Sequence, residues 1–262
     1  ALRIGIPIVP HYLSGIILNQ GDRIMIDKMV GKTEVALYGL AYSIGMLVQL
    51  FISGMNSALT PWMYSKIKKG DIRSMRKVLQ LLSIVVVGIA VALMLISPEL
   101  VLIFGSPKYR EAVYVIPPVA ASVFFIFIYN ILSMPQFYYE KTQFLMAASM
   151  AAAGANVVLN FIFIRLFGYI AAGYTTLACY MLYSVGHYIV SKRILVKEGI
   201  QENLMSPGFL VACSVFLIGA SIICNLIFPY RILRYAILLA SAGLVFWKKE
   251  LLLKTMADIR KK

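Results

Sequence analysis

Charged residues are scarce in this chain, and that scarcity sets its class. Only 14% of the 262 residues are charged, whereas 61% are hydrophobic and the mean hydropathy is +0.83. A soluble domain carries about a quarter charged residues and about half apolar ones. The composition therefore excludes an ordinary soluble globular protein and a disordered chain, and it indicates a polytopic helical membrane protein.

Cysteine and histidine are too few and too far apart for a metal centre. Cys179, Cys213 and Cys224 lie in apolar runs without a CxxC spacing, and His11 is distant from His187. An odd number of cysteines without paired spacing also excludes a disulfide scaffold. The sequence contains no HExxH, GxSxG or GxxxxGK(S/T) motif. We therefore predict no catalytic residue, no metal site and no cofactor.

Long apolar runs are what the sequence has in place of such motifs. Eight of them lie near 4–28, 34–63, 78–104, 112–138, 144–164, 168–190, 207–228 and 232–247. Each approaches the roughly 20 helical residues that cross a bilayer. The sequence thus predicts an all-α bundle of about eight transmembrane helices. We expect six spans in 1–190, and a basic linker, an appended helix pair and a basic tail in 191–262.

Basic residues are concentrated in the gaps between these runs. The net charge of +14 comes from 25 Lys and Arg against 11 Asp and Glu, and the richest gaps are 66–77 and 192–197. This pattern favours a topology signal over nucleic-acid binding. The positive-inside rule then puts both termini of this chain on the cytoplasmic side of the inner membrane of a prokaryote. We expect the segment 66–77 to contact anionic membrane lipids.

The first apolar run carries the most informative polar side chains. His11, Asn19 and Asp22 fall near one helix face, and Arg23 follows directly. A charge inside the bilayer is costly unless it faces protein or water, so this stripe predicts a water-filled cavity. The alternative is that Arg23 reaches the outer headgroups with Asp22 as its partner. We expect His187, by contrast, at the cytoplasmic interface.

Later runs contribute uncharged candidates for the same cavity. Gln49, Ser53, Asn56 and Thr60 share one face of the second run. They either line the cavity or hold helices together. Others lie in the fourth run and in the alanine-rich fifth run. The full set is Gln49, Ser53, Asn56, Thr60, Asn130, Asn156 and Asn160.

Several short segments resemble the second lobe of polysaccharide transporters. They are Pro10–Gly15, Asn19–Ile26, Gly31, Glu34–Tyr42, Asn56–Ala58 with Pro61–Trp62, and Tyr109 with Glu111–Ala112 and Ile116–Pro117. Together they make the chain similar to the oligosaccharide flippase branch, O-antigen flippase-like, of the multidrug/oligosaccharidyl-lipid/polysaccharide (MOP) exporter superfamily. The resemblance covers most of 1–190.

That resemblance implies two six-helix lobes around a central cavity, often with two extra helices. The chain then looks like the C-terminal lobe with the extra pair, its N-terminal lobe missing. Because it begins with Ala1 rather than Met, we expect it to be part of a longer protein. The implied function is export of polyprenyl-pyrophosphate-linked oligosaccharide by alternating access, with Arg23 at the position that holds pyrophosphate.

Two other functions remain open at this stage. An ion-coupled drug or metabolite antiporter of the same superfamily would use H⁺ or Na⁺, with Asp22 as the candidate carboxylate. A membrane glycosyltransferase or polymerase would need acidic residues in an outer loop, where Glu99 and Glu111 are available.

Overall fold

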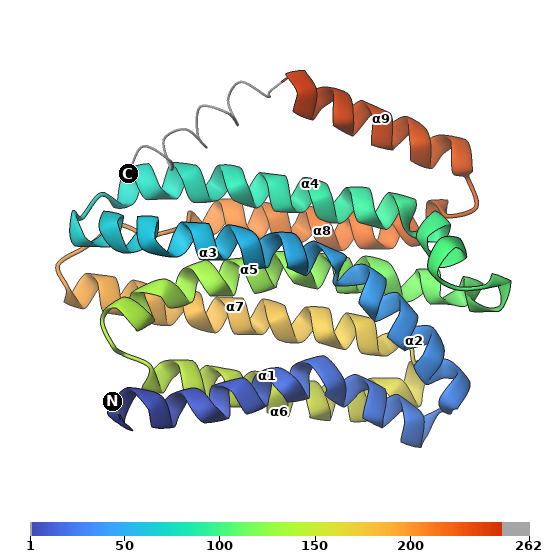
Figure 1. Ribbon diagram of the computed structural model, residues 1–262, viewed down its shortest axis with the longest axis horizontal. Helices are drawn as coiled ribbons and strands as arrows, with labels where there is room; N and C mark the ends of the chain where they lie inside the picture. The colour runs from blue at the N-terminus through green and yellow to red at the C-terminus, as the bar shows by residue number, and fades with distance from the viewer. Residues whose placement is uncertain (1, 248–262) are drawn as a thin grey trace.

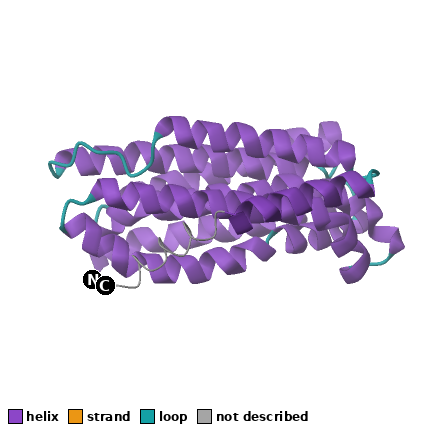
Figure 2. Ribbon diagram, turned by 90° about the horizontal axis from the view of Figure 1, so that it is seen from above, coloured by secondary structure: helices purple, strands orange, loops and turns teal. Residues whose placement is uncertain are grey.

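The protein is a bundle of long helices that run along one common axis (Figures 1 and 2). The computed structural model describes the backbone of residues 2–247 and the side chains of 13–241 and 243. The elements are α1 (Leu2–Met29), α2 (Lys32–Gly45), α3 (Leu47–Lys68), α4 (Ile72–Phe104), the 3-10 helix η1 (Pro107–Val115), α5 (Ile116–Tyr138), α6 (Gln143–Phe167), α7 (Ala171–Lys197), α8 (Pro207–Ile227) and α9 (Arg231–Trp247).

The expected all-α membrane bundle is confirmed, with two differences in detail. The second apolar run is broken at Met46 into α2 and α3, and η1 precedes α5 where one continuous helix was expected. Within the described residues, five helical segments are long and apolar enough to cross a membrane: Lys32–Lys68, Ile72–Phe104, Pro107–Tyr138, Gln143–Phe167 and Pro207–Ile227. α1 and α7 have spanning length, with 28 and 27 residues, whereas α9 has 17.

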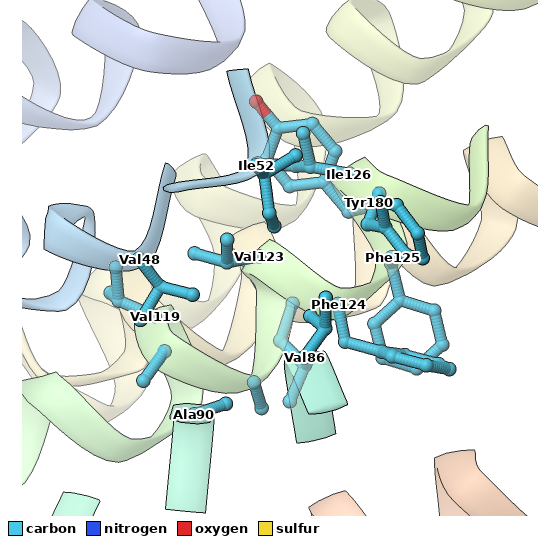
Figure 3. Close-up of a cluster of buried hydrophobic side chains, with 14 of the residues drawn as sticks. Val48, Ile52, Val86, Ala90, Val119, Val123, Phe124, Phe125, Ile126 and Tyr180 are labelled. Carbon is cyan, nitrogen blue, oxygen red and sulfur yellow. The ribbon is translucent and has the colours of Figure 1, made fainter. Parts of the chain in front are cut away.

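Helix α5 forms the centre of the bundle. Every residue from Ile116 to Ile128 is buried, because α3, α4, α7 and α8 all pack against this helix. Figure 3 shows the core that results, where side chains of α5 meet those of α3, α4 and α7. Its labelled members are Val48, Ile52, Val86, Ala90, Val119, Val123, Phe124, Phe125, Ile126 and Tyr180. A helix surrounded on all sides explains an apolar run without a polar face.

The other helices pack outward from this centre on two sides. α7 packs on α5, α6 packs on α7, and α1 lies along α6 (Figure 1). On the other side α4 packs on α5, and α8 and α9 pack on α4. The appended pair α8–α9 is therefore on the α4 side, away from α1 and α6.

The basic segment 66–77 is tied to the linker that precedes α8. Lys66 forms a 2.6 Å ion pair with Asp71, whose carboxylate also caps α4 by accepting from the Ser74 N–H at 3.3 Å. Arg73 forms a 2.6 Å ion pair with Glu202, and nearby Arg76 donates to a linker carbonyl. Part of this segment's charge thus fixes the linker, while Lys68, Lys69 and Lys77 are exposed.

Candidate polar site at the α1, α2, α6 and α7 junction

Asp22 joins four helices through its side chain. This α1 residue is fully buried. Its carboxylate accepts hydrogen bonds from Tyr38 Oη of α2 at 2.5 Å, Asn160 Nδ2 of α6 at 2.5 Å and Thr176 Oγ1 of α7 at 2.7 Å. A buried carboxylate is tolerated only when such donors replace its water. All three donors are neutral groups.

Further hydrogen bonds connect Asn160 to other polar side chains of α6 and α7. The Asn160 amide also donates to Asn156 Oδ1 at 3.1 Å, and its Oδ1 accepts a short hydrogen bond from the Thr175 hydroxyl. The buried Asn156 Nδ2 has no hydrogen-bond partner among the described residues. The structure therefore brings together three residues predicted from the sequence, Asp22, Asn156 and Asn160.

Three members of this site were not singled out as candidates from the sequence. Tyr38 lies in a predominantly apolar run, and Thr175 and Thr176 lie in a helix rich in small residues. The spacing of Thr176, Tyr183 and His187 on one face of α7 was the available signal, because a polar stripe on a buried helix needs partners.

Arg23 forms no ion pair with Asp22, so the alternative in which these two residues are partners is not observed. Neighbouring residues on an α-helix are turned by about 100° from each other. The Arg23 guanidinium lies 5.3 Å from the ring centre of Tyr42, and its Nη1 donates to Gln20 Oε1 at 3.2 Å. The buried Nε has no hydrogen-bond partner, and no carboxylate lies within 4.0 Å among the described side chains.

A cavity of about 380 Å³ lies beside Asn19, between α1, α5, α6 and α7. Asn19 accepts from the Tyr42 hydroxyl at 2.8 Å and donates to the Gly15 carbonyl at 2.7 Å. The lining residues are Gly15, Ile16, Leu18, Asn19, Gln20, Tyr129, Ser149, Tyr180 and Tyr183. The side chain of His11, the first residue of the predicted stripe, lies outside the described part of the structure.

The polar stripe of α3 does not join the Asp22 site through any observed hydrogen bond. Ser53 donates to the Gln49 carbonyl at 2.9 Å, and Thr60 donates to the Asn56 carbonyl at 2.8 Å, so both hydroxyls bond within their own helix. Asn130 of α5 is half-buried and accepts from a nearby serine through its backbone carbonyl. No hydrogen bond observed among the described residues joins them to Asp22, Asn156 or Asn160.

His187 is buried inside the bundle, and its expected place near the cytoplasmic interface stays a prediction. Its Nδ1 lies 2.7 Å from Gln136 Nε2 of α5, and its ring packs between Tyr129 and Tyr183. α7 continues to Lys197, ten residues further. At 1.5 Å per residue, the helix end is about 15 Å away from His187.

Glu99 of α4 forms an ion pair with a residue of α9. Both its carboxylate oxygens accept from Arg234 at 2.8 Å, and one also accepts from the Tyr235 hydroxyl at 3.0 Å. Arg234 in turn is buried and donates to the Leu95 carbonyl. One of the two acids that a membrane glycosyltransferase would need is thus part of the α4–α9 contact.

Residues 7–162 match the family MatE, which covers more than half of the chain. The chain belongs to the MatE family. Members of this family are helical membrane transporters of the MOP superfamily. The matched part of this MatE chain contains Asp22, Arg23, Tyr38, Asn156 and Asn160, whereas the α7 donors lie beyond it.

Two curated relatives are similar to part of this MatE chain, and both come from Haemophilus influenzae. "Lsg locus putative protein 1" is 29% identical over 157 residues, which is 57% of this chain and 38% of the relative. An "Uncharacterized membrane protein" is 31% identical over 134 residues, or 48% of this chain and 32% of the relative. The match therefore spans about a third of the length of these relatives. No solved structure matches significantly.

Proposed function

We propose that the transporter containing this MatE chain exports lipid-linked oligosaccharide across the cytoplasmic membrane for surface polysaccharide biosynthesis. The observation that carries the proposal is Arg23. It is a half-buried guanidinium in α1 without a carboxylate partner in the described structure. A polyprenyl-pyrophosphate carries negative charge on its non-bridging phosphate oxygens, and a planar guanidinium binds a pair of such oxygens through two parallel hydrogen bonds.

Exposed apolar side chains on α1 and α3 support a site shared with a second lobe. On α1 the side chains of Leu13, Ile16 and Ile24 are exposed, and on α3 so are Leu50 and Phe51. In this proposal the N-terminal lobe of the same transporter covers that surface, and the sugar head crosses between the lobes while the polyprenyl tail stays in lipid. Rocking of two lobes about a central site gives alternating access.

The test removes the charge of Arg23 in the intact transporter. We expect Arg23→Ala to abolish oligosaccharide-lipid export and to trap the substrate on the cytoplasmic side, whereas Arg23→Lys keeps a reduced rate because an ammonium lacks the planar fork. Arg165→Ala is the matched control. The Arg165 guanidinium also lies over an aromatic ring, 3.9 Å from the ring centre of Phe161, but the Arg165 side chain is exposed. Normal surface polysaccharide in Arg23→Ala cells without a paralogue would contradict the proposal.

Asp22 favours a second candidate function, an antiporter driven by H⁺ or Na⁺. Its carboxylate is enclosed by three neutral donors and has no ion-pair partner in the described residues. Such a carboxylate is typical of ion pathways in membrane proteins. If coupling runs through it, Asp22→Asn stops gradient-driven efflux but not substrate binding. The control is Asp27→Asn on the same helix, because Asp27 is exposed. Efflux by Asp22→Asn at the native rate would exclude this function.

A further inference from the structure

An apolar groove runs between α7 and α8 on the outside of the bundle. Both helices pack on α5, and α5 provides the floor of the groove. The cavity has a volume of about 180 Å³, and its walls include Phe124, Ile128, Val185, Leu210 and Val211. The two serines in its lining donate to carbonyls of their own helices. A molecule bound in the groove therefore contacts almost only apolar groups.

The groove continues along α7 into a basic hollow. This second hollow, of about 570 Å³, is lined by Lys192, Arg193 and Lys197, and Tyr188 borders both spaces. Val185, Tyr188 and Lys192 follow one another at helical spacing, so one face of α7 changes from apolar to cationic along its length. From Val185 to Lys192 the axial distance is about 10 Å.

The three cations of this hollow have no ion-pair partner among the residues that the structure describes. Lys192, Arg193 and Lys197 are exposed, and none of them forms an ion pair with a described carboxylate. Glu202, in the linker to α8, is already bound to Arg73. The first residue of α8, Pro207, also lines the apolar groove.

We propose that this continuous groove binds an anionic glycerophospholipid of the surrounding bilayer. The acyl chain lies between α7 and α8 on the floor of α5, and the phosphate lies against Lys192, Arg193 and Lys197. The distance of about 10 Å between apolar and cationic parts fits within one leaflet, whose hydrocarbon half is about 15 Å thick. The inference is independent of the transported substrate. It concerns a lipid bound on the outside of the bundle, remote from Arg23.

The positive charge at one end of the groove favours an anionic phospholipid as the bound molecule. Three clustered cations at the end of a membrane groove attract an anionic headgroup more strongly than a zwitterionic one, with each cation contributing to the preference. A peptide helix in the same groove would have to place several carboxylates at one end of an apolar segment. A membrane phospholipid has that arrangement already, and the lipid surrounds the groove at high concentration.

The experiment measures lipid binding to the purified chain in detergent. Dioleoylphosphatidylglycerol and dioleoylphosphatidylcholine are titrated separately, and bound lipid is counted by native mass spectrometry. The charge variant is Lys192→Gln/Arg193→Gln/Lys197→Gln, and the groove variant is Val211→Trp, which fills the space between α7 and α8. The matched control, Lys28→Gln/Lys32→Gln/Lys108→Gln, removes three exposed cations that lie outside the segment 66–77 and do not line the groove. Size-exclusion profiles check that each variant folds.

We expect the native chain to bind phosphatidylglycerol at least about tenfold more tightly than phosphatidylcholine. The charge variant should lose about tenfold or more of the phosphatidylglycerol affinity, Val211→Trp should weaken binding of both lipids, and the control should change affinity less than about twofold. Equal affinity for the two lipids would overturn the proposal. An equal loss in the control would overturn it as well, because binding would then follow the general surface charge. Unchanged binding in Val211→Trp would show that the groove is not the site.

Discussion

At the scale of single residues, Asp22 is the point where four helices meet. Its donors lie on α2, α6 and α7, at positions 38, 160 and 176. In a bilayer, apolar side chains are solvated by lipid about as well as by a neighbouring helix, so buried hydrogen bonds and close packing carry more of the specificity of helix association. The hydrogen bonds of Asp22 therefore determine which helices gather on this side of the bundle.

Tyr38→Phe tests this role without changing the shape of the core. The variant leaves the buried carboxylate with two donors, and we expect the free energy of unfolding to fall by about 1–2 kcal/mol. Tyr42→Phe is the comparison, because Tyr42 donates to Asn19, which is only half-buried and can bind water instead. Its cost should be about 0.5 kcal/mol. The measurement is denaturant unfolding in detergent, and a larger loss for Tyr42→Phe would argue against the role given to Asp22.

The residue-level site was only partly predictable from the sequence. A polar side chain in an apolar run is conspicuous, which is why Asp22, Asn156 and Asn160 were selected. Their partners were not, because a tyrosine or threonine is common in any membrane helix. Hydrogen bonds between residues 138 or 154 positions apart depend on tertiary packing that local patterns do not encode. For the same reason the sequence left two readings of Asp22 open, one facing a cavity and one paired with Arg23.

At the scale of elements, the helix break between α2 and α3 lies next to a close contact with α5. Gly45 is the last residue of α2, and a Cβ atom there would lie 2.6 Å from Val119 Cγ1 of α5. The second apolar run therefore has to pass very close to the central helix at this point. A glycine in a long apolar run was the available signal, but the position of the break depends on α5.

Gly45→Ala should destabilise the bundle by about 1–3 kcal/mol, since the new methyl group has to displace Val119 or shift a helix. Gly54→Ala is its control, because a Cβ at Gly54 would meet nothing within 4 Å. That substitution should be neutral or stabilise the protein by up to about 1 kcal/mol. Thermal unfolding of both variants gives the comparison, and equal stability of the two would contradict the close approach.

The contact between α4 and α9 depends on one ion pair. Arg234 is buried and Glu99 is partly exposed, so removing one partner leaves an uncompensated group in a restricted site. We expect Arg234→Met to cost about 2–3 kcal/mol and to speed hydrogen exchange in α9. The double variant Glu99→Gln/Arg234→Met should recover part of this loss, because it leaves no unpaired charge. An unchanged exchange rate in Arg234→Met would mean that other contacts hold α9.

The helices themselves were largely predictable from the sequence. Eight apolar runs appear in the structure as helices, because in a membrane length and apolarity nearly determine the element. Neither property locates a break such as the one at Met46, or a 3-10 segment such as η1, because both are set by packing against neighbouring helices.

At the scale of the whole molecule, one end of the bundle carries two clusters of exposed basic residues. That end holds the α3–α4 turn with Lys68 and Lys69, and the end of α7 with Lys192 and Lys197. Figure 1 shows these turns together at the left of the bundle. This distribution supports the proposed cytoplasmic orientation of that end.

Single cysteines at the two ends of α4 test the orientation. In a background without the three native cysteines, Lys69→Cys precedes α4 and Lys108→Cys follows it, and both positions are exposed. A membrane-impermeant maleimide added to intact cells should label Lys108→Cys alone, whereas disrupted membranes should give labelling at both. Labelling of Lys69→Cys in intact cells would reverse the topology.

The distribution of the Asp22 contacts along the chain also affects how the protein is made. During synthesis α1 and α2 emerge before α6 and α7, so Asp22 can meet Tyr38 before Asn160 and Thr176 are available. Until α6 and α7 arrive, a carboxylate in α1 lacks two of its three donors. A chain that stops short of α7 thus carries in the membrane a carboxyl group that lacks hydrogen-bond donors, so the first helix of this bundle depends on the last of these partners for a satisfied interior.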